Sequence, residues 1–121
     1  WGLSRFAKEG NALFGQWTWS KNSGLKPEKK PNANFYVKSF KNLQSSVDSY
    51  LLNLNTHIAY KKMRNFRYLI KIRNKEFKGI HFAKYLDRYA EIGYEYVKKV
   101  TKLIKINKFE EYNKIKFEQK V

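Results

Sequence analysis

The sequence predicts an α+β fold that is mostly α-helical, with a small β flap near the N-terminus. The chain has 121 residues, enough for one domain with a modest core. From Val47 to Ile104 the apolar residues recur at steps of three and four, which is typical of amphipathic helices. Strand-like sequence is confined to the run "FYVKSF" (35–40), and both prolines lie shortly before it, within residues 20–34.

The first nineteen residues predict a short helix followed by a loop. Ser4 can cap a helix that runs to about Glu9, and Gly10-Asn11 can end it. Gly15 permits backbone torsions that other residues resist, so we expect "NALFGQWTW" (11–19) to form a tight loop that leads into an extended segment. The polar stretch 20–34 then predicts a flap, and residues 35–40 predict a strand.

The remainder predicts four helices. A capping box over Ser45-Ser46-Val47-Asp48 is expected to begin the first of them, with the Asp48 carboxylate facing the free amides. Gly93 is expected to close the third. The apolar stripes are Val47, Tyr50, Leu51, Leu54 and Ile58; Met63, Phe66, Leu69 and Ile70; Ile80, Ala83, Leu86 and Ala90; and Tyr94, Val97, Val100 and Ile104.

Beyond Asn107 the periodicity is thin and most residues are charged. We therefore expect residues 1–107 to form the domain and residues 108–121 to form a charged C-terminal extension, either a loosely docked helix or a tail.

The charge of the chain is strongly positive, with 26 Lys and Arg against 10 Asp and Glu, a formal net charge of +16. Such a surface attracts nucleic acid, anionic lipid or an anionic cell-wall polymer. Abundant Lys, Asn, Ile, Tyr and Phe also fit a bias in nucleotide composition, and both explanations stay open. The chain has no cysteine, which excludes disulfides, thiolate zinc sites and cysteine nucleophiles. No run approaches the roughly 18 apolar residues that a membrane span needs.

Few polar residues are candidates for chemistry. His57 and His81 lie far apart, without carboxylates at ligand spacing, so no metal site is predicted. His57 follows Asn55 and Thr56, which favours a hydrogen-bonded structural histidine. Glu28 lies in the flap between prolines, where it is either a carboxylate that closes over a sugar or a surface residue among lysines.

Aromatic residues gather in the loop-rich first third of the chain. They can fill a core, or they can line a cleft in which their faces stack on pyranose rings or on nucleobases. The set comprises Trp1, Phe14, Trp17, Trp19, Phe35 and Tyr36. Core packing is favoured for Phe14, and both interpretations stay open for the others.

Three blocks resemble the glucosaminidase family of bacterial peptidoglycan hydrolases (glycoside hydrolase family 73), and in particular its Bax-like branch. "WGLSRFAKEGNALFGQW" (1–17) is similar to the W-G-x-S-x-x-A…G-N-N-x-F-G run of that branch, although Ala12 replaces its second Asn. "SVDSYLLNLNTHIAYKKMR" (46–64) resembles its S-V-x-x-Y-x-x-N-L-N-T-H-x-A-Y-x-x-x-R helix. "LDRYAEIGYEYVKKV" (86–100) resembles its Y-S-x-x-G-x-x-Y block through Tyr89, Gly93 and Tyr96.

The resemblance implies a lysozyme-like fold, in which a helical lobe and a small β flap enclose a glycan cleft. It implies hydrolysis of the β-1,4 bond after N-acetylglucosamine in peptidoglycan, a β-N-acetylglucosaminidase reaction that needs no metal or cofactor. In the family the general-acid glutamate precedes the W-G pair, so we expect this chain to be a fragment that starts just after it and is inactive by itself.

The resemblance also implies a set of site residues. Asn11, Phe14 and Gly15 are expected on one wall of the cleft and Tyr89 opposite, as a catalytic contributor. Glu28 is the candidate for the second acid that family members often carry in the flap. Two cysteines common in this branch are replaced here by Thr18 and Ser23. The expected substrate-binding residues are Trp1, Asn11, Phe14, Gly15, Trp17 and His57.

The expected partner is therefore the glycan strand of peptidoglycan in the bacterial periplasm or cell envelope, with electrostatic association to an anionic wall or membrane surface. Two alternatives stay open: a basic module that binds single-stranded nucleic acid through its aromatic residues, and a protein that binds glycan without cutting it. Against the first, the chain shows no RRM, KH or OB signature.

Overall fold

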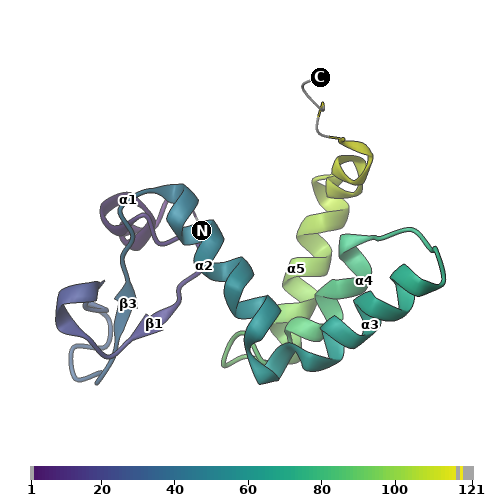
Figure 1. Cartoon of the computed structure of the whole chain (residues 1–121). Coiled ribbons are helices and arrows are strands. Elements are labelled where there is room, and N and C mark those ends of the chain that lie inside the picture. The colour runs from purple at the N-terminus through teal and green to yellow at the C-terminus, as the bar shows by residue number, and fades with distance from the viewer. Residues whose placement is uncertain (1, 117, 119–121) are drawn as a thin grey trace. The chain divides into compact units, whose positions relative to one another are not determined.

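A computed structural model describes residues 2–116 and residue 118 of the chain. It has a mostly α-helical α+β fold with one small antiparallel sheet, as the sequence predicts. The residues form two compact units, 1–55 and 56–121 (Figure 1).

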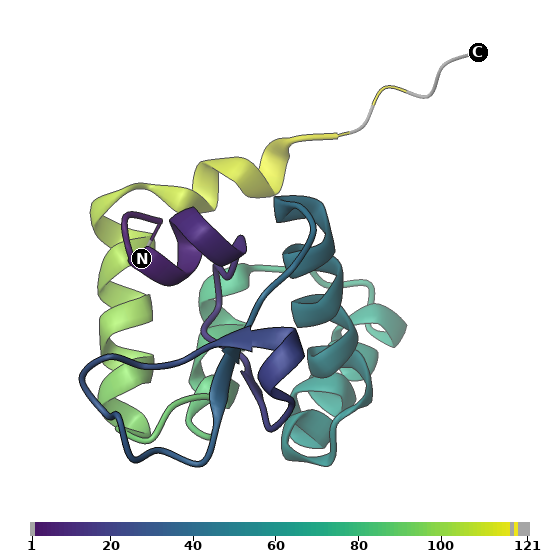
Figure 2. The same cartoon turned by 90° about the vertical axis from the view of Figure 1, so that its left-hand side faces the viewer.

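The sheet belongs to the first unit. It comprises β1 (Trp17–Thr18), β2 (Gly24–Leu25) and β3 (Tyr36–Lys38), in the order β1-β3-β2 with both pairs antiparallel. Val37 is paired with Trp17 on one side and with Leu25 on the other. The predicted strand within residues 35–40 is thus confirmed. The flap additionally contains η1 (Lys21–Ser23) and β2, which are too short to leave a periodic signal; the long loop that joins β2 to β3 can be followed in Figure 2.

Helix α1 (Arg5–Gly10) has the two caps that its sequence predicts. The Ser4 hydroxyl accepts a hydrogen bond from the backbone N–H of Ala7, and Asn11 ends the helix in the left-handed conformation at φ 52°. Gly10 lies against the sheet, because a Cβ there would be 3.0 Å from Ser39 Oγ and 3.1 Å from Leu25 Cδ1. The absence of a side chain at Gly10 therefore lets α1 pack closely on the flap.

Helix α2 (Leu43–Thr56) begins earlier than its sequence predicts. The cap is Asn42, whose Oδ1 accepts hydrogen bonds from both the backbone N–H and the hydroxyl of Ser45. The predicted capping box is wrong: Asp48 accepts instead from the side chain of Gln44, and Ser46 is fully buried, where its hydroxyl accepts from the N–H of Leu13. Both side chains of the predicted box thus have other local partners, Ser45 with Asn42 and Asp48 with Gln44.

The second unit is helical. It contains η2 (Ile58–Tyr60), α3 (Lys61–Ile72), α4 (Gly79–Ala83), η3 (Lys84–Leu86), α5 (Tyr94–Ile106) and η4 (Phe109–Lys114). Rings of α3, α4 and η3 cluster, with centroids 5.3 Å apart for Phe66 and Phe82 and 5.4 Å apart for Phe66 and Tyr85. The buried apolar residues of this unit are Tyr60, Met63, Ile70, Ala83, Leu86 and Val97.

The predicted second and fourth helices are confirmed as α3 and α5. The third is shorter than expected, because regular helix ends at Leu86 and a turn runs from there to Gly93. Gly93 has φ +55°, which favours glycine, and it precedes α5 rather than closing the third helix. Within the C-terminal extension, η4 contacts α5 and α4.

Candidate functional site

The loop between α1 and β1 carries three of the predicted site residues, Asn11, Phe14 and Gly15, and the first and last of them have positive φ angles that their residue types favour. Asn11 takes the left-handed conformation, and its side-chain Nδ2 donates to the backbone oxygen of Phe40 at 2.9 Å. Gly15 has φ +62°, and no other atom lies within 4 Å of where its Cβ would be. Asn11 therefore fixes the start of the loop to the end of the flap, while Gly15 turns the chain into β1.

The aromatic residues of this loop form two stacked pairs. Phe14 stacks on Tyr50 of α2 with ring centroids 4.1 Å apart, and Trp17 stacks on Phe35 with centroids 3.8 Å apart. Trp17 nevertheless remains 45% exposed and Trp19 is 70% exposed. The Phe14 ring is thus partly used in packing, whereas the two indoles present aromatic surface to the solvent at the edge of the sheet.

Gln16 is a candidate that the sequence analysis missed. Its side-chain Oε1 is buried and has no hydrogen-bond partner among the described residues. Its backbone oxygen accepts from the N–H of Lys38 at 2.7 Å, which holds the residue against β3. An unsatisfied buried acceptor is a candidate for binding only where a movement of the loop exposes it to a ligand hydroxyl or amide. A single amide in a loop gives no sequence signal of this kind.

Glu28 lies in the loop between β2 and β3, 76% exposed, and is held by an ion pair. Its Oε1 is 3.1 Å from Nε of Arg5. The same guanidinium pairs with Glu9 at 3.2 Å and donates to the backbone oxygen of Lys26. The predicted second acid is thus bound to α1 in this structure, and a role over a sugar requires the carboxylate to leave Arg5.

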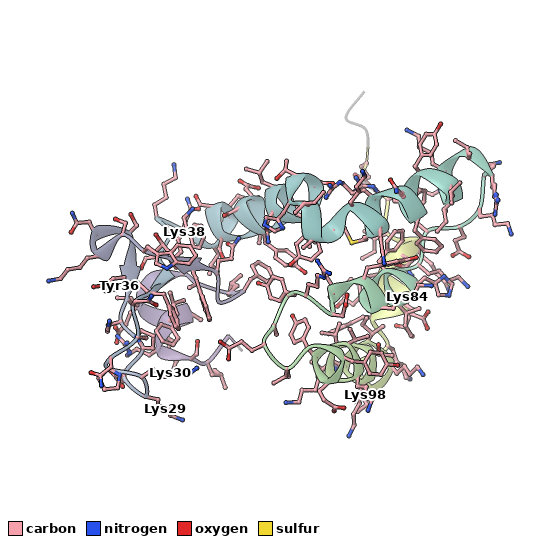
Figure 3. The ribbon with its side chains drawn as sticks, turned by 90° about the horizontal axis from the view of Figure 1, so that it is seen from below. Lys29, Lys30, Tyr36, Lys38, Lys84 and Lys98 are labelled. Carbon is pink, nitrogen blue, oxygen red and sulfur yellow. The ribbon has the colours of Figure 1, made fainter. Side chains whose placement is uncertain are left out.

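Lysines surround the aromatic residues of the flap. Lys26 donates to the backbone oxygen of Ala33, and its Nζ lies 5.0 Å from the ring centroid of Tyr36. Lys29 and Lys30 are exposed on the loop between β2 and β3 (Figure 3). The first unit therefore carries exposed indoles at β1 and exposed lysines on the loop between β2 and β3, residue types that suit a polyanionic or sugar-rich ligand.

Two predicted site residues, His57 and Tyr89, belong to the second unit. His57 Nδ1 accepts a hydrogen bond from the N–H of Ala59, and its backbone oxygen accepts from Arg64. This is the structural role that the neighbours of His57 favour. Tyr89 is half-buried in the turn between η3 and α5, and its ring lies on that of Tyr96 with centroids 5.4 Å apart. Burial raises the pKa of Tyr96 above its ordinary value.

A hollow of about 410 Å³ lies beside the same turn. Lys84, which lines it, also has its Nζ 5.1 Å from the ring centroids of both Phe66 and Tyr85; Lys84 is labelled in Figure 3. The hollow therefore offers two ammonium groups, two phenol rings and one carboxylate. Its lining residues are Lys62, Lys84, Tyr85, Asp87, Gly93 and Tyr94.

The structure thus brings part of the predicted site together. Asn11, Phe14, Gly15, Trp17 and Glu28 share the first unit, whereas His57 and Tyr89 share the second. Trp1 lies outside the described residues. Within residues 2–116 and 118, no three His, Asp or Glu side chains are grouped as metal ligands. In the same part of the chain, no helix has the length and apolarity that crossing a membrane demands.

Comparison with protein-family models, with curated proteins and with solved structures finds no match for this chain.

Proposed function

We propose that this chain belongs to a peptidoglycan hydrolase of the endo-β-N-acetylglucosaminidase type, with a lysozyme-like arrangement and a site in the cell envelope. The proposal starts from the three sequence blocks that resemble the Bax-like glucosaminidases. It is supported by the fold class, since a helical chain with one small sheet is what that resemblance implies.

The observation that carries the proposal is the conformation of the loop between α1 and β1. Asn11 occupies a left-handed position and Gly15 a positive-φ position, so two residues of the G-N…F-G motif sit where their types are favoured. The exposed indoles of Trp17 and Trp19 come two and four residues after Gly15 in the sequence. The motif thus leads the chain directly into a sheet edge with exposed aromatic rings, and such rings suit the binding of a pyranose polymer.

The proposed roles differ between residues. Trp17 and Trp19 stack on sugar rings, and Asn11 holds the loop that carries them. Gln16 Oε1, which is buried and has no partner among the described residues, accepts a hydrogen bond from the glycan once binding has opened the loop. Tyr89 contributes near the scissile bond. The general acid is the glutamate that the resemblance places before the W-G pair, and it protonates the leaving oxygen.

The experiment uses protein that includes the residues encoded ahead of Trp1, incubated with purified sacculi. The expected result is release of muropeptides with N-acetylglucosamine at the reducing end, and loss of that release when the upstream glutamate is replaced by Gln. Trp17→Ala with Trp19→Ala should also reduce release, whereas Tyr68→Ala should not, because Tyr68 is 63% exposed on α3, far along the chain from the motif.

The same protein tests the alternatives. Binding to sacculi without release, in a protein that carries the upstream glutamate, would make the chain a glycan-binding module. High affinity for single-stranded oligonucleotides that falls steeply with salt, without affinity for glycan, would identify a nucleic-acid binder and overturn the proposal.

A further inference from the structure

The C-terminal extension carries an apolar stripe that the helical period of 3.6 does not reveal. Helix η4 is a 3₁₀ helix, which has three residues per turn, so residues three apart lie on one face. Phe109 and Tyr112 have this spacing within η4, and their rings meet edge to face with centroids 6.1 Å apart. Ile115 follows three residues later as the extended residue that caps the helix. We call Phe109, Tyr112 and Ile115 the C-terminal stripe.

This stripe is open to solvent. Phe109 is 47% exposed, Tyr112 65% and Ile115 64%. Ile106, the last residue of α5, is 65% exposed just before the stripe begins. Figure 1 shows η4 in yellow directly after α5. Four large apolar side chains within ten residues are thus left facing water, which is unfavourable unless another surface covers them.

Positive charge surrounds the stripe. Five lysines between residues 102 and 116 are all exposed, against two glutamates in the same span. The chain as a whole has a formal charge of +16, so the same sign extends beyond this segment. Long lysine side chains beside apolar residues can direct their ammonium groups to a charged layer while their carbon chains remain in apolar contact. The lysines are Lys102, Lys105, Lys108, Lys114 and Lys116.

An anionic lipid surface matches both properties. Its headgroups attract the lysines, and the boundary of its acyl chains accepts apolar side chains. A nucleic acid matches the charge but not Ile106 and Ile115, because aliphatic side chains do not stack on bases as aromatic ones do. The two residue types together therefore favour lipid.

We infer that the segment from the end of α5 through η4 is a surface that binds the interface of anionic membranes, with the C-terminal stripe inserted and the lysines at the headgroups. This inference rests on residues outside those that carry the proposed glycan site, so it stands or falls separately from the proposed hydrolase activity.

The test is co-sedimentation of the full chain with vesicles of phosphatidylcholine alone, or of phosphatidylcholine with one third phosphatidylglycerol. Binding is expected only to the anionic vesicles, and it should weaken when the salt concentration is raised from about 0.1 M to about 1 M. Tyr112→Ser with Ile115→Ser should reduce partitioning roughly tenfold or more, because the inserted apolar area is lost while every lysine remains.

The matched control is Tyr68→Ser with Ile72→Ser on α3, which removes the same residue types at similar exposure, 63% and 59%. This variant should bind like the unchanged chain. Equal loss in both variants, equal binding to both vesicle types, or unchanged binding after removal of Tyr112 and Ile115 would each overturn the inference. So would a stripe variant that binds vesicles normally but loses affinity for single-stranded oligonucleotides. Circular dichroism of both variants should match the unchanged chain, because all four side chains are exposed.

Discussion

Arg5 on α1 holds Glu28 of the flap by an ion pair, with 3.1 Å between Nε and Oε1. The other guanidinium nitrogens contact Glu9 and the backbone oxygen of Lys26, so one side chain joins the first helix to the loop between β2 and β3. The Arg5 side chain is 31% exposed and that of Glu28 is 76% exposed, so water reaches the pair from the Glu28 side. The position of Glu28 in this structure therefore depends on Arg5.

Replacing Arg5 by Gln should release the flap loop. We expect a loss of about 0.5–1 kcal/mol in the free energy of unfolding, since part of the pair is exposed, and faster amide exchange over residues 26–34. Mass-detected hydrogen exchange measures the second effect. Lys8→Gln on the same helix is the control and should leave that exchange unchanged. Equal exchange in the Arg5 variant and the control would show that Arg5 does not restrain the loop.

Glu28→Gln separates the two interpretations of this carboxylate. If Glu28 is the second acid, its replacement should abolish muropeptide release by protein that includes the upstream residues, while Arg5→Gln should preserve it. If the carboxylate only anchors the loop, both variants should reduce activity to a similar, modest extent. Rates of release from sacculi, compared at equal protein concentration, decide between them.

Gln16→Met should stabilise the fold and weaken the proposed binding of glycan. The change removes a buried acceptor that has no partner among the described residues, so we expect a gain of about 1 kcal/mol in the free energy of unfolding. Affinity for glycan should fall, because the proposed acceptor is lost. Gln44→Met, at an exposed position on α2, is the matched control and should change neither quantity. A destabilised Gln16 variant would mean that the oxygen is satisfied in solution.

In protein that includes the residues encoded ahead of Trp1, Tyr89→Phe should lower the rate of muropeptide release far more than Tyr94→Phe. The half-buried Tyr89 ring can keep its stack on Tyr96 without the hydroxyl, so any large loss of rate would come from the phenolic oxygen. Tyr94 is 64% exposed at the start of α5 and serves as the control. Equal effects of the two substitutions would show that Tyr89 contributes to packing and not to the reaction.

Stability should fall at high pH through Tyr96. Burial raises the pKa of Tyr96 above its ordinary value of 10.0, so above that pH the unfolded chain loses this proton before the folded chain does. The free energy of unfolding should therefore be unaffected by this group below about pH 10 and decrease as the pH rises through the folded pKa. Thermal unfolding of Tyr96→Phe should show a shallower decrease than the unchanged chain, whereas Tyr94→Phe should not.

Local chemistry made α1 and the strand β3 predictable. Ser4 and Asn11 act through bonds to residues close in the sequence, and "FYVKSF" favours extended backbone wherever it lies. The start of α2 was predicted wrongly because Asn42 and Ser45 can both serve as caps. Ser46, in the same turn, is held by Leu13, a contact between distant segments that no local motif reveals.

The candidate site was likewise predictable only in part. The conformations at Asn11 and Gly15 follow from residue type, but the pairing of Glu28 with Arg5 depends on how the flap packs on α1. The C-terminal stripe was missed because its period is three, whereas the expected period of an amphipathic helix is 3.6. A short 3₁₀ helix gives too few residues for that difference to be recognised beforehand.

Among the described residues, Val37 alone is paired on both sides within the three-stranded sheet, with Trp17 and with Leu25. Each outer strand has two residues, and neither has any neighbour in the sheet besides β3. When β3 leaves its place, both outer strands lose their partner in the sheet at the same moment. The indoles at the β1 edge and the Glu28 loop that follows β2 should consequently become mobile in one cooperative opening event. A ligand bound at one edge should therefore also reduce the motion of the other edge.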